Sequence, residues 1–142
     1  MSAAYPEIEY RSERPTPDEF EGLYRASGWT EALDVSSDRL AAALPHAWYA
    51  ICARSAGRIV GTGLVLSDGA LHALIVDVIV APEMRGRGIG TEIMKGLIAR
   101  CREAGVLQVQ LFSASGKRGF YERLGFVARP DDGPGMELSG RN

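Results

Sequence analysis

The chain has 142 residues, of which 46% are hydrophobic and 24% charged, and this predicts a single globular domain over residues 1–142 with one core. The formal net charge of -2 and the pI near 5.7 exclude a broadly basic surface, so no nucleic acid is expected as a partner. Two cysteines exclude a disulfide framework, and the sequence shows neither a membrane-length apolar run nor a leader peptide, so we expect a cytoplasmic protein without a membrane partner.

The first part of the chain predicts an edge strand and two helices, each helix preceded by a residue that can cap it. The expected elements are a strand over residues 5–11, a helix from Thr16 or Asp18 to about Ser27 that ends with Gly28-Trp29-Thr30, and a helix over residues 37–44 that is capped by Ser36 or Ser37 and stopped by Pro45.

Three strands joined by tight turns follow. The turns Ser55-Ala56-Gly57 and Ser67-Asp68-Gly69 predict an antiparallel meander of strands over residues 48–54, 58–66 and 70–80. The last of these strands is nearly all apolar apart from Asp77, a composition that predicts a central strand buried on both faces.

An amphipathic helix and a parallel strand complete the predicted sheet. The helix over residues 89–104 carries an apolar stripe and closes at Gly105. Because the strand over residues 107–112 follows a helical crossover, it must run parallel to the strand over residues 70–80. The predicted fold class is therefore mixed α/β, and ligands bind at the carboxyl ends of such parallel strands.

A glycine-rich basic turn joins the strand over residues 70–80 to the following helix. Gly86, Gly88 and Gly90 leave main-chain N–H groups unobstructed, and the helix that begins there adds the positive end of its dipole, an arrangement that suits a pyrophosphate. The spacing excludes a dinucleotide-binding turn, which needs glycine in place of Thr91. It also excludes a P-loop, which needs glycine and lysine in place of Thr91 and Glu92.

Two ordered motifs resemble those of the GCN5-related N-acetyltransferases, the GNAT family. The first is R-x-x-G-x-G, formed by Arg85, Gly88 and Gly90, and the second is the run from Phe120-Tyr121 to Gly125-Phe126, which is similar to the closing helix and strand of that family. The resemblance covers roughly residues 47–138. It implies a central, mostly antiparallel sheet with a splayed parallel pair, strands 4 and 5, and flanking helices.

The resemblance also implies acetyl-CoA as the acyl donor, without a metal. Main-chain groups of Val78, Ile79 and Val80 would hold the pantetheine arm and the thioester carbonyl. The pyrophosphate would be held by the turn residues, which are Arg85, Gly86, Arg87, Gly88, Ile89, Gly90 and Thr91. Both arginines have the alternative interpretation of solvated turn charges.

Acetyl transfer to an amine poses three chemical tasks. An ammonium group with a pKa of about 10.4 must lose a proton, and the developing oxyanion must be stabilised. The thiolate of coenzyme A, whose thiol has a pKa comparable to that of cysteine, about 8.5, must leave. The resemblance implies that the Val78 amide polarises the carbonyl and that Tyr121 donates a proton to the sulfur. The alternative for Tyr121 is an aromatic side chain that packs beside Phe120.

Asp77 is the candidate for the base, since Leu74 and Val76 are apolar where members of the family often carry a carboxylate or histidine. Asp77 could bind the substrate ammonium, accept its proton through water, or cap a neighbouring backbone group or arginine, and all three roles stay open. His72 is predicted to be an edge or surface residue.

One branch of the family is more similar than the rest. The run of residues 77–82 and the ending of residues 126–136 resemble the small plant and cyanobacterial serotonin N-acetyltransferases and their bacterial relatives, which implies an arylalkylamine or polyamine substrate. The large aromatic side chains could line its pocket or belong to the core, and they are Tyr24, Trp29, Trp48 and Tyr49. Ala114 departs from the asparagine that many relatives carry at that position.

The expected function is direct acetyl transfer from acetyl-CoA to a primary amine of a small molecule. Cys52 and Cys101 are predicted core residues, which argues against a covalent cysteine intermediate. Two alternatives are a binding module that senses acyl-CoA without turnover and an enzyme that acetylates a protein or an aminoacyl-tRNA. The sequence leaves the acceptor, the acyl chain length and a homodimeric state open.

Overall fold

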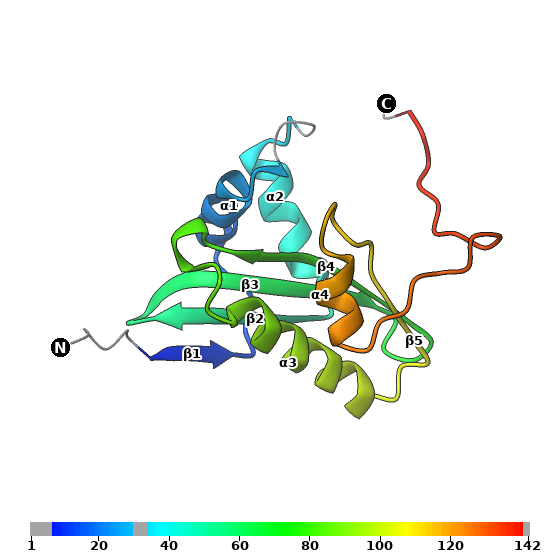
Figure 1. Ribbon diagram of the computed structural model, residues 1–142. Helices are drawn as coiled ribbons and strands as arrows, with labels where there is room; N and C mark the ends of the chain where they lie inside the picture. The colour runs from blue at the N-terminus through cyan, green and yellow to red at the C-terminus, as the bar shows by residue number, and fades with distance from the viewer. Residues whose placement is uncertain (1–6, 30–33, 141–142) are drawn as a thin grey trace. The chain divides into compact units, whose positions relative to one another are not determined.

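The computed structural model describes residues 7–29 and 34–140 (Figure 1). The described residues up to Leu111 form one compact unit, and those from Phe112 onward form a second. A single domain over the whole chain stays a prediction.

The first unit contains a five-stranded sheet with the strand order β1-β2-β3-β4-β5. Its strands are β1 (Ile8–Arg11), β2 (Tyr49–Ser55), β3 (Arg58–Ser67), β4 (His72–Val80) and β5 (Gln108–Gln110). Neighbouring strands are antiparallel except β4 and β5, which are parallel. The predicted meander, the parallel pair and the fold class are thus confirmed. Residues 5 and 6 of the predicted first strand lie outside the described residues.

The helices begin where the sequence places their caps. They are α1 (Pro17–Ala26), α2 (Ser37–Ala43), α3 (Ile89–Glu103) and the short 3-10 helices η2 (Leu44–His46) and η3 (Pro82–Met84). Thr16 caps α1 in a capping box with Glu19, and Ser36 caps α2. Thr30, expected just after α1, lies outside the described residues.

The helix α2 ends just before Pro45, as expected. It ends at Ala43, and the chain continues as the 3-10 helix η2, with Pro45 in the first turn of η2. This is sterically permitted because a residue in the first turn of a helix has no intrahelical acceptor for the N–H that proline lacks.

The helices of the first unit cover both faces of its sheet. Figure 1 shows α1 and α2 on one face of β3 and β4 and α3 on the other. The α1/α2 side contains a core cluster that includes Phe20 and Leu23 of α1, Leu64 of β3 and Ile79 of β4. On the other side most of the predicted α3 stripe is buried, namely Ile89, Ile93, Met94, Leu97 and Cys101, whereas Ile98 of the same stripe is half-buried.

β4 is not buried on both faces, contrary to the prediction from its composition. Ala73, Ile75 and Ile79 are buried, whereas His72 is exposed and the remaining residues of the strand are half-buried. Although β4 lies inside the sheet, its neighbour β5 is only three residues long, so much of one side of β4 lacks a covering strand. The exposure of His72 confirms that it is a surface residue.

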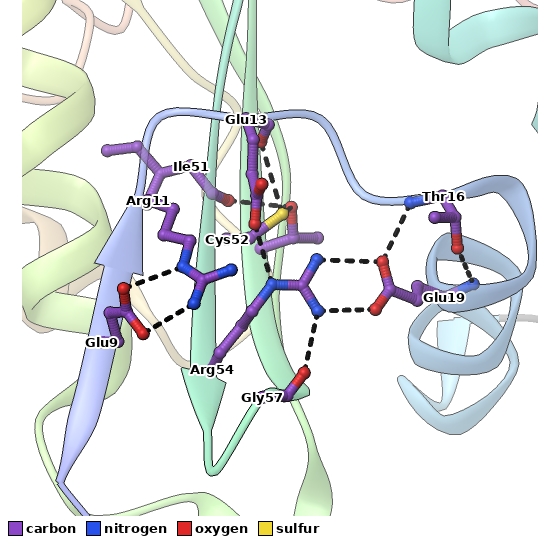
Figure 2. Close-up of polar contacts among 10 residues, drawn as sticks. Glu9, Arg11, Glu13, Thr16, Glu19, Ile51, Cys52, Arg54 and Gly57 are labelled. Carbon is purple, nitrogen blue, oxygen red and sulfur yellow. Dashed lines mark hydrogen bonds and ion pairs between the residues drawn. The ribbon is translucent and has the colours of Figure 1, made fainter.

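A buried arginine ties β2 to α1. Figure 2 shows the Arg54 side chain between two carboxylates, with Nε donating to Glu13 Oε1 at 2.8 Å and Nη1 donating to Glu19 Oε2 at 2.6 Å. Nη1 also donates to the Gly57 carbonyl at 3.2 Å. Since Glu19 is also the capping-box residue of α1, one side chain both caps the helix and docks it on the sheet.

The Glu19 ion pair predicts acid sensitivity. The Arg54 guanidinium lowers the pKa of Glu19 from 4.5 to about 2, so the stability from this pair is present above the unfolded-state pKa and is lost as the pH falls from 4.5 toward 2. Glu19→Gln should lower the free energy of unfolding at neutral pH by about 3 kcal/mol and flatten its dependence on pH in that window. Urea unfolding at several pH values measures both.

The matched control is Glu9→Gln on β1, which removes the partner of Arg11. Both side chains of that pair are exposed, at 59% and 45%, so solvent screens their attraction and stability should change little. An equal loss in the two variants would contradict the structural role assigned to Glu19.

The second unit contains the helix α4 (Arg118–Arg123). The helix predicted around Tyr121 is therefore confirmed. The prediction of a strand at Phe126 is wrong: residues 112–140 contain no strand. The turn after α4 is closed by the Phe126 amide, which donates to the Tyr121 carbonyl at 3.1 Å.

Candidate functional site

The edge of β4 that faces β5 is open over most of its length. Only His72, Ala73 and Leu74 pair with β5. From Ile75 to Val80 the strand continues without a partner on that side, in the part of the chain that the structure describes. Its backbone N–H and C=O groups can therefore pair with an extended ligand, as an added strand would.

A β-bulge interrupts β4 within this open stretch. Thr62 pairs with Ile79 and Leu64 pairs with Val76, so Asp77 and Val78 together lie opposite Gly63. Asp77 has a φ of +52°, a left-handed conformation that aspartate adopts more readily than most residues. Such bulges redirect backbone groups and side chains, and they are frequent beside active sites.

The bulge changes which residues of β4 share a face. Val76 and Ile79 both lie on the α1/α2 side, packed in or against its core cluster. Val78 lies on the α3 side, where its Cγ2 would be 3.4 Å from a Cβ added to Gly63. Because of the bulge, side chains do not alternate strictly between the two faces of the sheet at this point of the strand.

The Asp77 carboxylate has no hydrogen bond or ion pair among residues 7–29 and 34–140. Its side chain is half-buried. Burial raises the pKa of Asp77 above its ordinary value, since desolvation disfavours the charged form. An uncompensated, partly desolvated carboxylate at a strained backbone position can attract a cation or accept a proton.

The glycine-rich turn leads directly into the N-terminus of α3. Gly86 and Gly88 have φ values of +79° and +80°, and Gly88 is the N-cap without a side-chain hydrogen bond. The first amide of this helix end with a backbone acceptor is that of Glu92, which donates to Gly88 at 3.1 Å. The amides of residues 89–91 therefore remain available to an anion, together with the dipole of a 15-residue helix.

Arg85 links the turn to the end of β4. Its Nε donates to the Val80 carbonyl at 3.3 Å, which leaves the other guanidinium donors available. The interpretation of Arg85 and Arg87 as phosphate-binding residues stays a prediction.

Tyr121 lies in the second unit, within an aromatic group. Its ring packs edge-on against Phe120 and Phe126, with centroids at 5.0 and 6.2 Å. Burial raises the pKa of Tyr121 above 10.0, so the phenol keeps its proton at neutral pH. Both interpretations of this residue, packing and proton donation, are compatible with that environment.

The four large aromatic residues form two separate pairs. Tyr24 and Trp29 meet edge-on at the end of α1, with centroids 6.4 Å apart. Tyr24 belongs to the core cluster with Ile79, and Trp29 is 39% exposed. Trp48 and Tyr49 instead pack beneath Arg100 of α3.

Both cysteines are buried, as predicted. Burial raises the pKa of the Cys52 thiol to about 11 and also raises that of Cys101, so neither is a reactive thiolate at neutral pH. Within the described ranges, no group of three or more His, Cys, Asp or Glu residues is placed to hold a metal ion. No helix there is long and apolar enough to cross a membrane.

Sequence reasoning anticipated the glycine turn, but it missed two features of this region. The bulge at Asp77 has no turn or glycine signal within β4 itself. The role of Gly63, opposite the bulge, depends on contacts with α3 that are distant in sequence.

Comparisons with known proteins agree with these features. A family model described as the acetyltransferase (GNAT) family matches residues 8–126, so the likeness begins well before residue 47. Serotonin N-acetyltransferase 2, chloroplastic, of Oryza sativa subsp. japonica is 38% identical over 103 residues, which are 70% of this chain and 52% of that protein. An uncharacterized N-acetyltransferase of Porphyra purpurea is 37% identical over 58% of this chain and 47% of its own length. The chain thus spans about half the length of these curated relatives.

Solved structures show the same architecture. A GNAT family acetyltransferase of Streptococcus pneumoniae has a TM-score of 0.80 at 28% identity, covering 96% of this chain and all 100% of that one. A probable acetyltransferase of Staphylococcus aureus has a TM-score of 0.84 at 22% identity, covering 94% of this chain and 100% of that one, and this second likeness supports the fold alone.

Proposed function

Since this chain belongs to the acetyltransferase (GNAT) family, we propose that it transfers the acetyl group of acetyl-CoA to a primary amine of a small molecule. The observation that carries the proposal is the continuity of the open β4 edge, the bulge at Asp77 and the N-terminus of α3. These three features lie along one stretch of chain, residues 75–91. They offer an extended set of backbone groups followed by a cluster of free amides.

The donor would lie along this stretch. Main-chain groups of Val78, Ile79 and Val80 would pair with the pantetheine arm as a strand does. The amides of residues 86–91 would donate to the pyrophosphate, which carries only acceptors, and Arg85 and Arg87 would add charge. Because Gly86 and Gly88 have open space where a Cβ would be, a phosphate group can approach the backbone closely.

The chemistry would use two side chains and one amide. The amine nitrogen attacks the thioester carbon while the Val78 amide donates to the carbonyl oxygen. Asp77 accepts the ammonium proton, directly or through water, so that the nitrogen has a free electron pair. The attack leaves the nitrogen positively charged, so it loses a second proton to water. The carbon–sulfur bond then breaks, Tyr121 donates its proton to the departing sulfur, and exchange with solvent restores the protonation states of Tyr121 and Asp77.

The acceptor would be an arylalkylamine or a polyamine. The half-buried Asp77 carboxylate can attract an ammonium group, because no neighbouring cation compensates it among the described residues. The relative from Oryza sativa subsp. japonica bears the name of serotonin N-acetyltransferase. Trp29, which is partly exposed and packs against Tyr24, would supply an aromatic contact on the α1 side.

Calorimetry with acetyl-CoA tests the proposal directly. We expect saturable binding of acetyl-CoA, followed by its consumption in the presence of one of a panel of arylalkylamines, polyamines, amino acids, aminoglycosides and N-terminal peptides. Arg85→Gln should weaken binding of acetyl-CoA more than binding of pantetheine, because a pyrophosphate contact is lost. Absence of acetyl-CoA binding would overturn the proposal, whereas binding without turnover across the panel would favour an acyl-CoA sensor.

A further inference from the structure

Two glycines of β3 lie directly beneath α3. A Cβ added to Gly61 would be 3.0 Å from Ile93 Cδ1 and 3.3 Å from Ile89 Cγ2. A Cβ added to Gly63 would be 2.7 Å from Ile93 Cγ2 and 2.9 Å from Leu97 Cδ1. Neither glycine has a positive φ, so close packing, and not backbone conformation, requires glycine at position 63 and favours it at position 61. We call Gly61 and Gly63 the glycine seat of α3.

The side chains that rest on the seat cannot move aside easily. Ile89 is 2% exposed, and Ile93 and Leu97 are 0% exposed. Protein interiors are packed as densely as organic crystals, so a methyl group added beneath these residues must displace the helix or the strand.

The seat also adjoins the bulge. Gly63 is the single residue of β3 that lies opposite Asp77 and Val78. A Cβ there would meet Val78 Cγ2 at 3.4 Å, in addition to the two α3 side chains. One residue without a side chain therefore contacts both structures that the proposed function uses, the bulge and the helix whose N-terminus follows the glycine turn.

We propose that the glycine seat is a positioning element that sets the distance between the N-terminus of α3 and the bulge peptide. This inference rests on the proposed function, in which the helix end holds the pyrophosphate and the bulge holds the thioester. At the native distance, both halves of one acetyl-CoA molecule engage their sites at once.

A fixed spacing matters because the two halves of the donor are covalently joined. When the first half binds, the second is held near its site at a high effective concentration, provided that the separation of the sites fits the linker. A shift of about 1 Å between them reduces this gain strongly, although each site alone still binds its own half.

Gly63→Ala tests the inference. Binding of acetyl-CoA, of 3′-phosphoadenosine 5′-diphosphate as the half that carries the pyrophosphate and of S-acetylpantetheine as the other half is measured for wild type and variant. We expect acetyl-CoA to bind about tenfold or more weakly to the variant, while the affinity for each separate half is unchanged. A general packing defect would weaken binding of the two halves as well. A loss of affinity for acetyl-CoA without a loss of affinity for either half therefore identifies a change of spacing.

Gly22→Ala is the control. Gly22 is an exposed residue of α1, and a Cβ there would have no neighbour within 4 Å, so the substitution adds a methyl group without displacing a helix or a strand. We expect all three ligands to bind this variant as they bind wild type. If Gly63→Ala does not fold, Gly61→Ala replaces it. Its Cβ would be 3.0 Å from Ile93 Cδ1 and 3.2 Å from the Ile79 carbonyl oxygen, which is less crowded than at Gly63, and a smaller loss of the same kind is expected.

Three results decide the matter. A loss confined to acetyl-CoA in a seat variant supports the inference. Unchanged acetyl-CoA affinity, or an equal loss for both halves, overturns it while the proposed function stands. If wild type binds none of the three ligands, the proposed function itself fails and the inference fails with it.

Discussion

Tyr121→Phe is expected to lower the rate constant of acetyl transfer by about 100- to 10,000-fold, the usual contribution of a general acid. The substitution removes only the hydroxyl, so the ring can keep its edge-on contacts with Phe120 and Phe126 at 5.0 and 6.2 Å. The departing sulfur then has no proton donor. Steady-state kinetics under saturating acetyl-CoA measures the effect on kcat.

The affinity of Tyr121→Phe for acetyl-CoA should remain that of wild type, because the hydroxyl acts only when the bond to sulfur breaks. Tyr10→Phe on β1 is the control, since Tyr10 is a partly exposed tyrosine outside the residues proposed for catalysis, and its rate should not change. If Tyr121→Phe retains the wild-type rate, Tyr121 is a packing residue of the second unit and the proton comes from elsewhere.

Asp77→Asn is expected to lower the rate constant by about 100-fold or more, since the amide cannot accept a proton from the ammonium group. Asparagine has nearly the same volume and also tolerates the left-handed backbone, so the fold should be kept. Because burial raises the pKa of Asp77, removing the charge should leave the thermal stability at neutral pH equal to or above that of wild type. The pH–rate profile of wild type should rise as this carboxyl group ionises.

Asp77→Gly distinguishes the backbone strain at Asp77 from the proposed role of its carboxylate in catalysis. Glycine adopts a φ of +52° without steric cost, so this variant should unfold at a higher temperature than wild type while its activity is lost. Ala56→Gly is the matched control, because Ala56 in the β2–β3 turn is the other described residue besides glycine with a positive φ, at +50°. It should gain stability and keep full activity. A rate near that of wild type in Asp77→Asn would show that another group accepts the proton.

Local signals were sufficient for most elements of the first unit. Thr16 and Ser36 cap their helices as predicted, because a capping hydrogen bond joins residues three apart in the chain. The turns at Gly57 and Gly69 adopt positive φ values of +80° and +77°, which side chains disfavour and glycine permits. The glycine-rich turn before α3 could be predicted for the same reason.

Longer-range contacts account for what the sequence did not show. The Arg54 side chain joins carboxylates 41 and 35 residues away in the chain, and no local pattern indicates either partner. The apolar run of β4 predicted burial on both faces, yet the short β5 leaves its edge open. The apolar composition of β4 shows that its side chains can be buried, but the length of the neighbouring strand determines how much of β4 is covered.

The amino-acid sequence by itself determined the meander of β2, β3 and β4, the position of the glycine turn and the likeness to an acetyltransferase family, because each depends on residues within tight turns or short motifs. The tertiary structure alone decided the bulge at Asp77 and the packing of α3 on Gly61 and Gly63. The register of β3 against β4 places Asp77 and Val78 together opposite Gly63. Strand register and close packing depend on contacts between segments that are distant in the chain, so local sequence patterns do not determine them.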